Sequence, residues 1–331
     1  MAFRLAGLLV MTLTVWPSVA QGGQSVTSEA DVTVGRSTEG STAASTQVRI
    51  FGATASDWRY FAEASWGGVR GPATDAFNSA YPYDNRIRAM EAYVEKGLSR
   101  NGRLTIVRAG RYRLPFGIFN RGDYAYSGFL RAPLIRYGEN FALSNTFLEE
   151  GADVLVGTPA LSLEGSLGMP ADEGDAHRRR GLDTAFRGQI YYRSFIVGVS
   201  HVRTQPADPR DFATGGMTFS GVDARWTSGG TLLRGEWIDG QPFDTVRTRG
   251  GYLDAVMHLV GMGPVTAVAR VERLDYDAGP FSSYLRRGTL GARVRIASFL
   301  TGQADVVRQP GGLARARSTA WDFGLTFSRR F

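Results

Sequence analysis

The feature that most constrains the fold is an alternation of apolar and polar residues at the end of the chain. In residues 318–331 the odd positions carry Trp321, Phe323, Leu325 and Phe327, and the even positions between them are polar, charged or glycine. Because side chains of a β-strand point alternately to opposite faces, this segment predicts a strand with one aromatic and one polar face. Such a strand can cover a protein core or, if the pattern recurs around a closed wall, face a membrane.

The same alternation recurs along the whole chain. Residues 47–53, for example, place Val48 and Ile50 on one face and Gln47 and Arg49 on the other. Further strands are predicted near residues 29–34, 58–66, 90–95 (with Met90 on the apolar face), 103–112, 152–156, 161–167, 186–192, 195–203, 222–226, 233–237, 253–259, 265–272, 290–296 and 300–306.

Soluble all-β folds also alternate, and three of them can be compared with this pattern. A solenoid or a propeller needs a fixed sequence repeat, which the chain lacks, and a sandwich seldom holds so many strands in one domain. No segment after the N-terminal region reaches 18 consecutive apolar residues, which excludes a bundle of membrane-spanning helices. The pattern favours a transmembrane β-barrel, in which lipid contacts the apolar face and water contacts the polar face.

The connections between the predicted strands alternate in length. Seven are short, near residues 55–57, 99–102, 157–160, 193–194, 228–230, 261–264 and 297–298. Eight longer ones lie between them, including 67–86, 113–149, 239–250 and 276–286. Short periplasmic turns and long extracellular loops are typical of outer-membrane barrels. We therefore predict an all-β, antiparallel barrel of about 16 strands, with fourteen and eighteen strands as the alternatives.

The N-terminal region has the pattern of an export signal. Arg4 precedes the apolar run Leu5–Val15, and Ser18-Val19-Ala20 has the small residues of a cleavage site. We expect residues 1–20 to be a cleaved signal peptide and residues 21–331 to form the barrel. The chain has no cysteine, so an exported form depends on hydrogen-bonded closure of the wall rather than on disulfides.

Two short motifs resemble those of Gram-negative outer-membrane porins. The chain ends in Phe331 on an alternating strand, and Gly110–Gly117 reads GRYRLPFG, which is similar to a segment of the phosphate-selective porin O/P group. The resemblance implies an outer-membrane location among lipid and lipopolysaccharide, a homotrimer, and recognition of Phe331 by the barrel-assembly machinery. The chain departs from the phosphate-selective members because Lys96 is its only lysine, whereas they line their path with lysine.

The connection 113–149 is too long for a simple rim loop. It is rich in aromatic residues, among them Phe116, Phe119, Tyr124 and Phe129, and long loops in compact domains are either functional or disordered. We expect it to fold into the barrel and narrow the pore, as the third long loop does in similar porins. An external flap and a contact between subunits are the alternatives.

Charged side chains on the polar faces would set the selectivity of such a pore. The candidates for the constriction are Arg111, Arg113, Arg121, Asp123, Arg131, Arg136 and Glu139 in or beside the long connection, and Arg59, Arg293 and Arg295 on the wall. Each of them could equally form an ordinary cross-strand ion pair. The pattern predicts passive diffusion of small hydrophilic solutes with a weak preference for anions. A non-conducting structural or adhesive barrel and a channel specific for a phosphate-like anion are the alternatives.

Few residues carry the chemistry of an enzyme or a cofactor site. The only histidines are His177, His201 and His258, and they are far apart in the sequence. No cluster has metal-ligand spacing, and no glycine-rich phosphate loop opens a helix. The chain has a net charge of +7, and its basic residues are almost entirely arginine. These arginines do not form basic blocks interleaved with stacking aromatic residues, as nucleic-acid sites require. We expect no enzyme activity, cofactor, metal or nucleic-acid partner.

Overall fold

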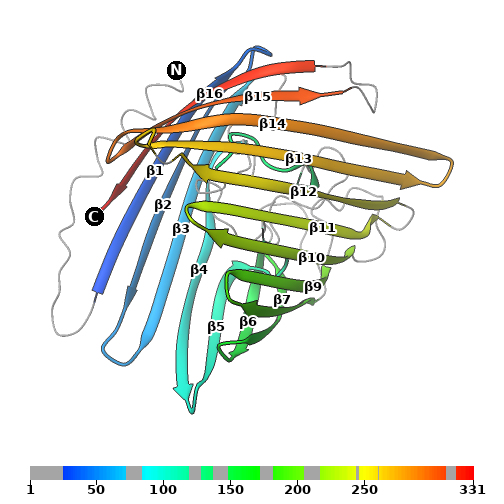
Figure 1. Ribbon diagram of the computed structural model, residues 1–331. Coiled ribbons are helices and arrows are strands. Elements are labelled where there is room, and N and C mark those ends of the chain that lie inside the picture. The colour runs from blue at the N-terminus through cyan, green and yellow to red at the C-terminus, as the bar shows by residue number, and fades with distance from the viewer. Residues whose placement is uncertain are drawn as a thin grey trace.

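Sixteen antiparallel strands form one closed barrel (Figure 1). The computed structural model describes residues 25–71, 84–118, 128–136, 148–171, 182–204, 217–243, 246–259, 261–310 and 318–331. The strands are β1 (Ser25–Ser37), β2 (Thr42–Ala53), β3 (Trp58–Arg70), β4 (Asp84–Arg100), β5 (Arg103–Arg113), β6 (Leu148–Gly157), β7 (Leu161–Pro170), β8 (Asp183–Tyr192), β9 (Phe195–Thr204), β10 (Met217–Ser228), β11 (Thr231–Phe243), β12 (Val246–His258), β13 (Val265–Ala278), β14 (Phe281–Ala297), β15 (Leu300–Gln309) and β16 (Ser318–Arg330). A short 3₁₀ helix, η2 (Leu134–Arg136), lies between β5 and β6. The predicted fold class and strand number are confirmed.

The first and last strands complete the wall, and Figure 1 shows β1 and β16 side by side. Their antiparallel register runs from Glu29 opposite Arg330 to Ser37 opposite Asp322. Phe331 extends this pairing, because its N–H donates to the Ser28 carbonyl at 2.8 Å. Closure gives both edge strands a partner, which a wall in lipid requires because lipid offers no hydrogen bonds to backbone groups.

The alternation in the sequence becomes an inside and an outside of the wall. On β16, Trp321 and Phe323 are 50% and 49% exposed, while Asp322 between them is fully buried. On β2, Ile50 is exposed and Arg49 is buried in the same way. The barrel therefore presents apolar side chains outward and keeps charged side chains inward, as predicted and opposite to a water-soluble protein.

Met90 is the clearest exception to the predicted faces. Glu63 lies opposite Glu91 and Ala64 lies opposite Ala89, so Met90 is the extra residue of a β-bulge in β4. Its side chain is 1% exposed and packs in the buried apolar cluster rather than facing outward. The prediction for Met90 was wrong because an inserted residue shifts the two-residue period, and the sequence pattern does not mark the insertion.

Two of the predicted long loops are hairpin extensions of the wall. Strands β11 and β12 continue to Phe243 and Val246, and β13 and β14 continue to Ala278 and Phe281, so the loops expected at 239–250 and 276–286 are mostly strand. Beyond the apolar belt both faces of a strand can carry polar residues, so the alternation that marks the other strands is lost there. The seven short turns lie between the strands where they were predicted.

No helix among the described residues is long and apolar enough to cross a membrane.

Candidate functional site

The inner face of the barrel carries charges of both signs in an uneven distribution. On β1 to β7 the inward carboxylates are Glu29, Asp31, Glu63, Glu91, Glu95, Glu149, Asp153 and Glu164, and the inward arginines include Arg49, Arg59, Arg88, Arg108 and Arg113. On β8 to β14 the inward arginines are Arg187, Arg225, Arg234, Arg270, Arg287, Arg293 and Arg295, and the inward carboxylates are Asp183, Asp223, Glu236, Asp254 and Glu272. One side of the lumen is therefore rich in acid and the opposite side is rich in arginine.

Ion pairs between neighbouring strands neutralise much of the acidic side. Arg49 lies 3.2 Å from Asp31 and 3.1 Å from Glu63. Arg113 at the end of β5 pairs with the other oxygen of Glu63 at 2.8 Å and with Glu91 at 2.9 Å. Because Glu63 is shared, the two arginines belong to one network across β1 to β5, and the predicted candidate Arg113 is one of its members.

A second network holds the arginine-rich side. Arg270 donates two hydrogen bonds to Asp254, at 2.6 and 2.9 Å, and Arg234 lies 3.0 Å from the same carboxylate. Arg287 pairs with Glu272 at 2.7 Å. These side chains are nearly excluded from solvent, so each charge depends on its partner to offset the cost of desolvation.

The described residues 128–136 lie against this second network on the inner face of the wall. The Leu130 N–H donates to Asp305 at 3.0 Å, and the Leu134 N–H donates to Glu272 at 2.6 Å. Arg131 donates two hydrogen bonds to Asp322 on β16, at 2.5 and 3.0 Å. Wall carboxylates on three strands therefore fix this part of the connection.

Wall donors bind the carbonyl groups of the same segment. Arg270 donates to the Arg131 carbonyl at 2.9 Å and stacks its guanidinium 4.0 Å from the centre of the Phe129 ring. Arg287 donates to the Ala132 carbonyl, and the Gln303 amide donates to the Gly128 carbonyl at 2.9 Å. Arg270 and Arg287 therefore bind wall carboxylates and carbonyl groups of residues 128–136 at the same time.

The first part of the connection lies against the opposite wall. Phe116 is 1% exposed and packs in the buried apolar cluster with residues of β9 to β11. The Gly117 N–H donates to Ser200 at 3.1 Å, and its carbonyl accepts from Arg187 at 2.5 Å. Gly117 has a φ of +57°, and a Cβ there would lie 1.7 Å from an oxygen of Glu236, so any other residue would be strained and would displace the Glu236 carboxylate. The described parts of the connection after β5 therefore contact the inner faces of strands between β8 and β16.

The structure places the predicted constriction residues in several environments. Arg293 and Arg295 lie on the inner face of β14, and Arg59 lies on the inner face of β3 near a short turn, 3.2 Å from Glu95. Arg111 shares the outward face of β5 with the exposed Val107, and it pairs at 3.5 Å with the exposed Glu150. Arg111 was therefore a wrong candidate, because it points away from the lumen. Arg121, Asp123 and Glu139 lie outside the described residues, as does the Arg136 side chain.

A group of polar side chains that was not among the constriction candidates surrounds a cavity of about 370 Å³ inside the barrel. Gly117 and Ile118 line one side, and Arg187, Gln189, Arg225 and Arg234 line the wall. Arg225 lies directly opposite Arg234 across β10 and β11. The Gln189 amide oxygen, turned to satisfy its neighbours, accepts from Arg225 at 3.3 Å and from Arg187 at 3.2 Å. The alternation of side chains along each strand identifies these wall residues as lumen residues. It does not reveal that Gly117 and Ile118 of the long connection lie over them.

The histidines form no site in the described part of the chain. His201 lies on the outward face of β9, where its Nδ1 is 2.9 Å from Ser220 Oγ, and His258 lies at the end of β12. His177 lies outside the described residues. Among the residues that the structure describes, no group of three or more histidine or acidic side chains could hold a metal ion.

Comparison with known proteins identifies the architecture. No protein-family model matches the chain, and no curated protein matches it. Among solved structures, OprB of Pseudomonas putida aligns with a TM-score of 0.66 at 11% identity, covering 93% of this chain and 94% of its own.

Two further porin structures align over nearly the same length. OmpF of Salmonella typhi, solved in complex with daunomycin, gives a TM-score of 0.65 at 10% identity, covering 92% of this chain and 97% of its own. An anion-selective porin from Comamonas acidovorans gives 0.62 at 11% identity, covering 93% and 99%. At these identities the likeness establishes the fold, which is the closed 16-stranded barrel of multi-pass outer-membrane proteins.

Proposed function

We propose that the chain forms a water-filled channel in the outer membrane of a Gram-negative cell for passive diffusion of small hydrophilic solutes. The observation that carries this proposal is the charged inner face, against which the described parts of 113–149 are braced by side chains from β9 to β16. A barrel that encloses water in a membrane requires charged and polar side chains on its inner face and apolar side chains on its outer face. The braced segment narrows that lumen, and rings of side-chain charge at the narrowing set selectivity.

The charge distribution supports a weak preference for anions. Arg225, Arg293 and Arg295 form no ion pair with any residue that the structure describes, whereas the inward carboxylates of β1 to β7 are largely paired with arginine. The unpaired arginines lie on one side of the lumen, so the field across it attracts anions to that side. Solutes with both charges would be oriented by the same field.

Planar-bilayer recording tests this function. Purified protein should give stepwise conductance, and a salt gradient should give a reversal potential of the sign for anion preference. Changing Arg225, Arg293 and Arg295 together to Gln should shift that potential toward cations, because three positive lumen charges are lost. The outward Arg203→Gln variant should leave it unchanged. A complete absence of conductance steps would refute the channel and favour a structural or adhesive barrel.

A channel specific for a phosphate-like anion is a second candidate, favoured by the cavity at Arg187, Arg225 and Arg234. Guanidinium groups bind phosphate and carboxylate in a bidentate manner. A specific channel should show chloride current that falls and saturates as inorganic phosphate is added, whereas a general channel should show no saturation. The Arg225→Gln variant should abolish any such block.

The assembly and partners of the channel are part of the same proposal. We expect a homotrimer in lipid and lipopolysaccharide, and delivery by the barrel-assembly machinery through Phe331. One solved relative in fold, OmpT of Vibrio cholerae, is described in a trimer form. Cross-linking of the purified protein in detergent tests the trimer, and a monomer alone would contradict it.

A further inference from the structure

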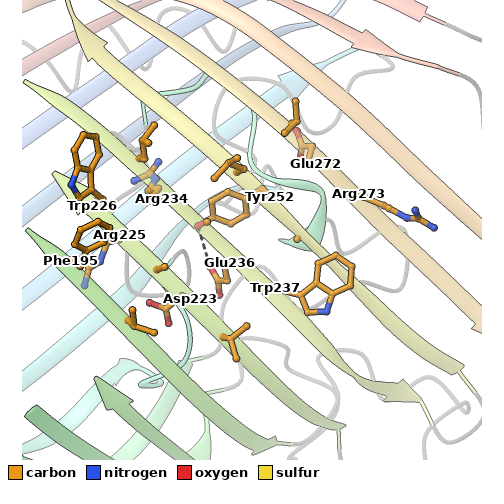
Figure 2. Close-up of a pocket in the computed structure, with 18 residues that line it drawn as sticks. Phe195, Asp223, Arg225, Trp226, Arg234, Glu236, Trp237, Tyr252, Glu272 and Arg273 are labelled. Atoms are coloured by element: carbon orange, nitrogen blue, oxygen red, sulfur yellow. Dashed lines mark hydrogen bonds between the residues drawn. The ribbon is translucent and has the colours of Figure 1, made fainter. Parts of the chain in front are cut away.

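An apolar groove crosses the outer surface of β9 to β13, with a volume of about 790 Å³. Figure 2 shows Phe195 and Trp226 toward one end of the groove and Trp237 and Arg273 toward the other. The outward side chains along it are apolar, while Asp223, Glu236 and Tyr252 alternate with them and point into the barrel, where Tyr252 donates to Glu236. The groove therefore belongs to the face that contacts lipid.

Two outward-facing glycines form the floor of the groove. Gly235 lies beside Leu253 and Gly251 lies beside Trp237, so the surface sinks to the backbone between large side chains. A Cβ at Gly251 would lie 2.3 Å from the Glu236 carbonyl oxygen, so the depression is a fixed part of the wall. A long apolar depression with aromatic ends has the shape and chemistry that suit an extended acyl chain.

The groove ends at a group of arginines on the same outer surface. Arg273 lies opposite Gly251 on one side and opposite Arg286 on the other. Arg273 also lines a second, polar cavity of about 370 Å³ with Arg247, Arg249 and Tyr284. The two cavities share Arg273, so an apolar depression and a cationic one are continuous along the outward side of the wall.

Carboxylates only partly balance these arginines. Asp275 is shared by Arg273 at 2.8 Å and Arg249 at 3.7 Å. Asp239 pairs with Arg247 at 2.7 Å. A third acid of this surface, Asp277, accepts from the Gly279 N–H and also attracts Arg247 electrostatically.

Arg286 forms no ion pair with a described residue, and neither does Arg308, its diagonal neighbour on β15. Arg273 and Arg286 both lie over the ring of Tyr284, at 5.8 and 4.9 Å from its centre. Like charges directly opposite one another on a sheet are destabilising. An anion placed between Arg273 and Arg286 would remove this repulsion and accept bidentate hydrogen bonds.

We propose that this surface binds a phosphate-bearing, acylated lipid of the outer leaflet. One acyl chain lies in the groove between Trp226 and Trp237, and the phosphate lies between Arg273 and Arg286. The orientation follows from the topology, because the arginines lie toward the long-loop rim and Trp226 lies toward the turn that follows β10. Charge complementarity favours this occupant over a second copy of the chain, because that copy would bring further outward arginines near its long-loop rim, such as Arg36, Arg203 and Arg308.

Lipid binding to the purified full-length protein tests the proposal. The probes are lipid A carrying both phosphates and the same lipid with its phosphates removed, each titrated in mixed micelles and counted per barrel by native mass spectrometry. Wild-type protein should bind the phosphorylated form at least tenfold more tightly. Equal binding of the two forms would overturn the proposal without any variant.

Matched variants locate the site. Arg273→Gln with Arg286→Gln should weaken binding of the phosphorylated lipid at least tenfold, a loss of ~1.4 kcal/mol or more, and leave the dephosphorylated form unaffected, because both charge-assisted contacts with the phosphate are removed. The control, Arg36→Gln with Arg203→Gln, removes two outward arginines at other positions of the long-loop rim and should change binding less than twofold. Trp226→Ala should weaken both lipids equally.

Heat-modified migration on gels confirms that each variant is folded. Equal losses in the arginine pair and the control would overturn the assignment to this patch. So would cross-links that place Arg273 or Trp237 between two copies of the chain. Because none of these readouts uses ion flow, failure of the lipid site and failure of the channel are distinguishable.

Discussion

The ion pair between Arg131 and Asp322 gives the sharpest test of the braced segment. The Arg131 and Asp322 side chains are 6% and 0% exposed, and two hydrogen bonds join them. Hydrogen bonds to charged groups contribute ~1.5–3 kcal/mol. Loss of the pair should therefore reduce the free energy that holds residues 128–136 (the seated segment) against the wall by about 2 kcal/mol. At 1.4 kcal/mol per factor of ten, the ratio of seated to released segment should fall about 30-fold.

Single-channel recording measures this ratio as the time spent in a low-conductance and a high-conductance level. Asp322→Ala removes the pair and should increase the high level by this factor, and Arg131→Ala should increase it at least as much, because it also removes the 3.2 Å contact with Glu39. They change the lumen charge in opposite directions, so the reversal potential should move toward cations in Arg131→Ala and toward anions in Asp322→Ala. A shared gain in conductance with opposite shifts in selectivity separates release of the segment from a simple charge effect.

A matched control removes a lumen arginine that makes no hydrogen bond or ion pair with the described residues 128–136. Arg108 pairs with Glu95, Asp153 and Glu164 on the acidic side of the wall and is 12% exposed. Arg108→Ala should shift selectivity and leave the time in each level unchanged. If the Arg131 and Asp322 variants keep the wild-type levels, or if Arg108→Ala alters them as strongly, the described contacts do not hold the segment in place.

Three further outcomes follow from single sites. Asp254→Asn leaves the 1%-exposed Arg270 without its carboxylate, so unfolding in denaturant should show a loss of ~3–5 kcal/mol. Gly117→Ala places a Cβ against Glu236 at a positive φ, so the segment should detach and channel recordings should show more of the high-conductance level, whereas a Glu236→Ala background should restore part of the wild-type behaviour. Deletion of Phe331 should lower the fraction of folded, heat-modifiable barrel made in cells while leaving refolding into detergent nearly unchanged, and equal losses in both would contradict its role as an assembly signal.

Much of the wall could be predicted from the sequence because the membrane imposes one simple rule on each strand. The alternation around Asp322 and Arg49 places both residues inward, and the structure confirms this. The rule fails where its physical basis is absent. Met90 sits in a bulge that resets the period, and the hairpins at 239–250 and 276–286 rise beyond the apolar belt, where both faces can be polar.

The candidate site was less predictable because contacts with the long connection are not local. A period of two residues separates inward from outward arginines, but it does not say which inward arginine meets a wall carboxylate, a loop carbonyl or no acid at all. Arg270 and Arg225 have the same pattern in the sequence, yet one binds Asp254 and the other faces a cavity beside Arg234. Arg111 was assigned to the lumen through its position beside the connection, although its alternation with Tyr112 places it on the outer face.

Thiol labelling tests most directly the central claim that one face of each strand contacts lipid and the other contacts water. The natural chain has no cysteine, so single substitutions report their own surroundings without background. Val222 and Arg225 lie three residues apart on β10, on opposite faces. In barrels reconstituted into vesicles, a charged, water-soluble maleimide should label Arg225→Cys quickly and leave Val222→Cys unlabelled, while brominated lipid should quench only a fluorophore attached at Val222→Cys. The reverse pattern, or equal labelling at the two positions, would contradict the partition on which the channel depends.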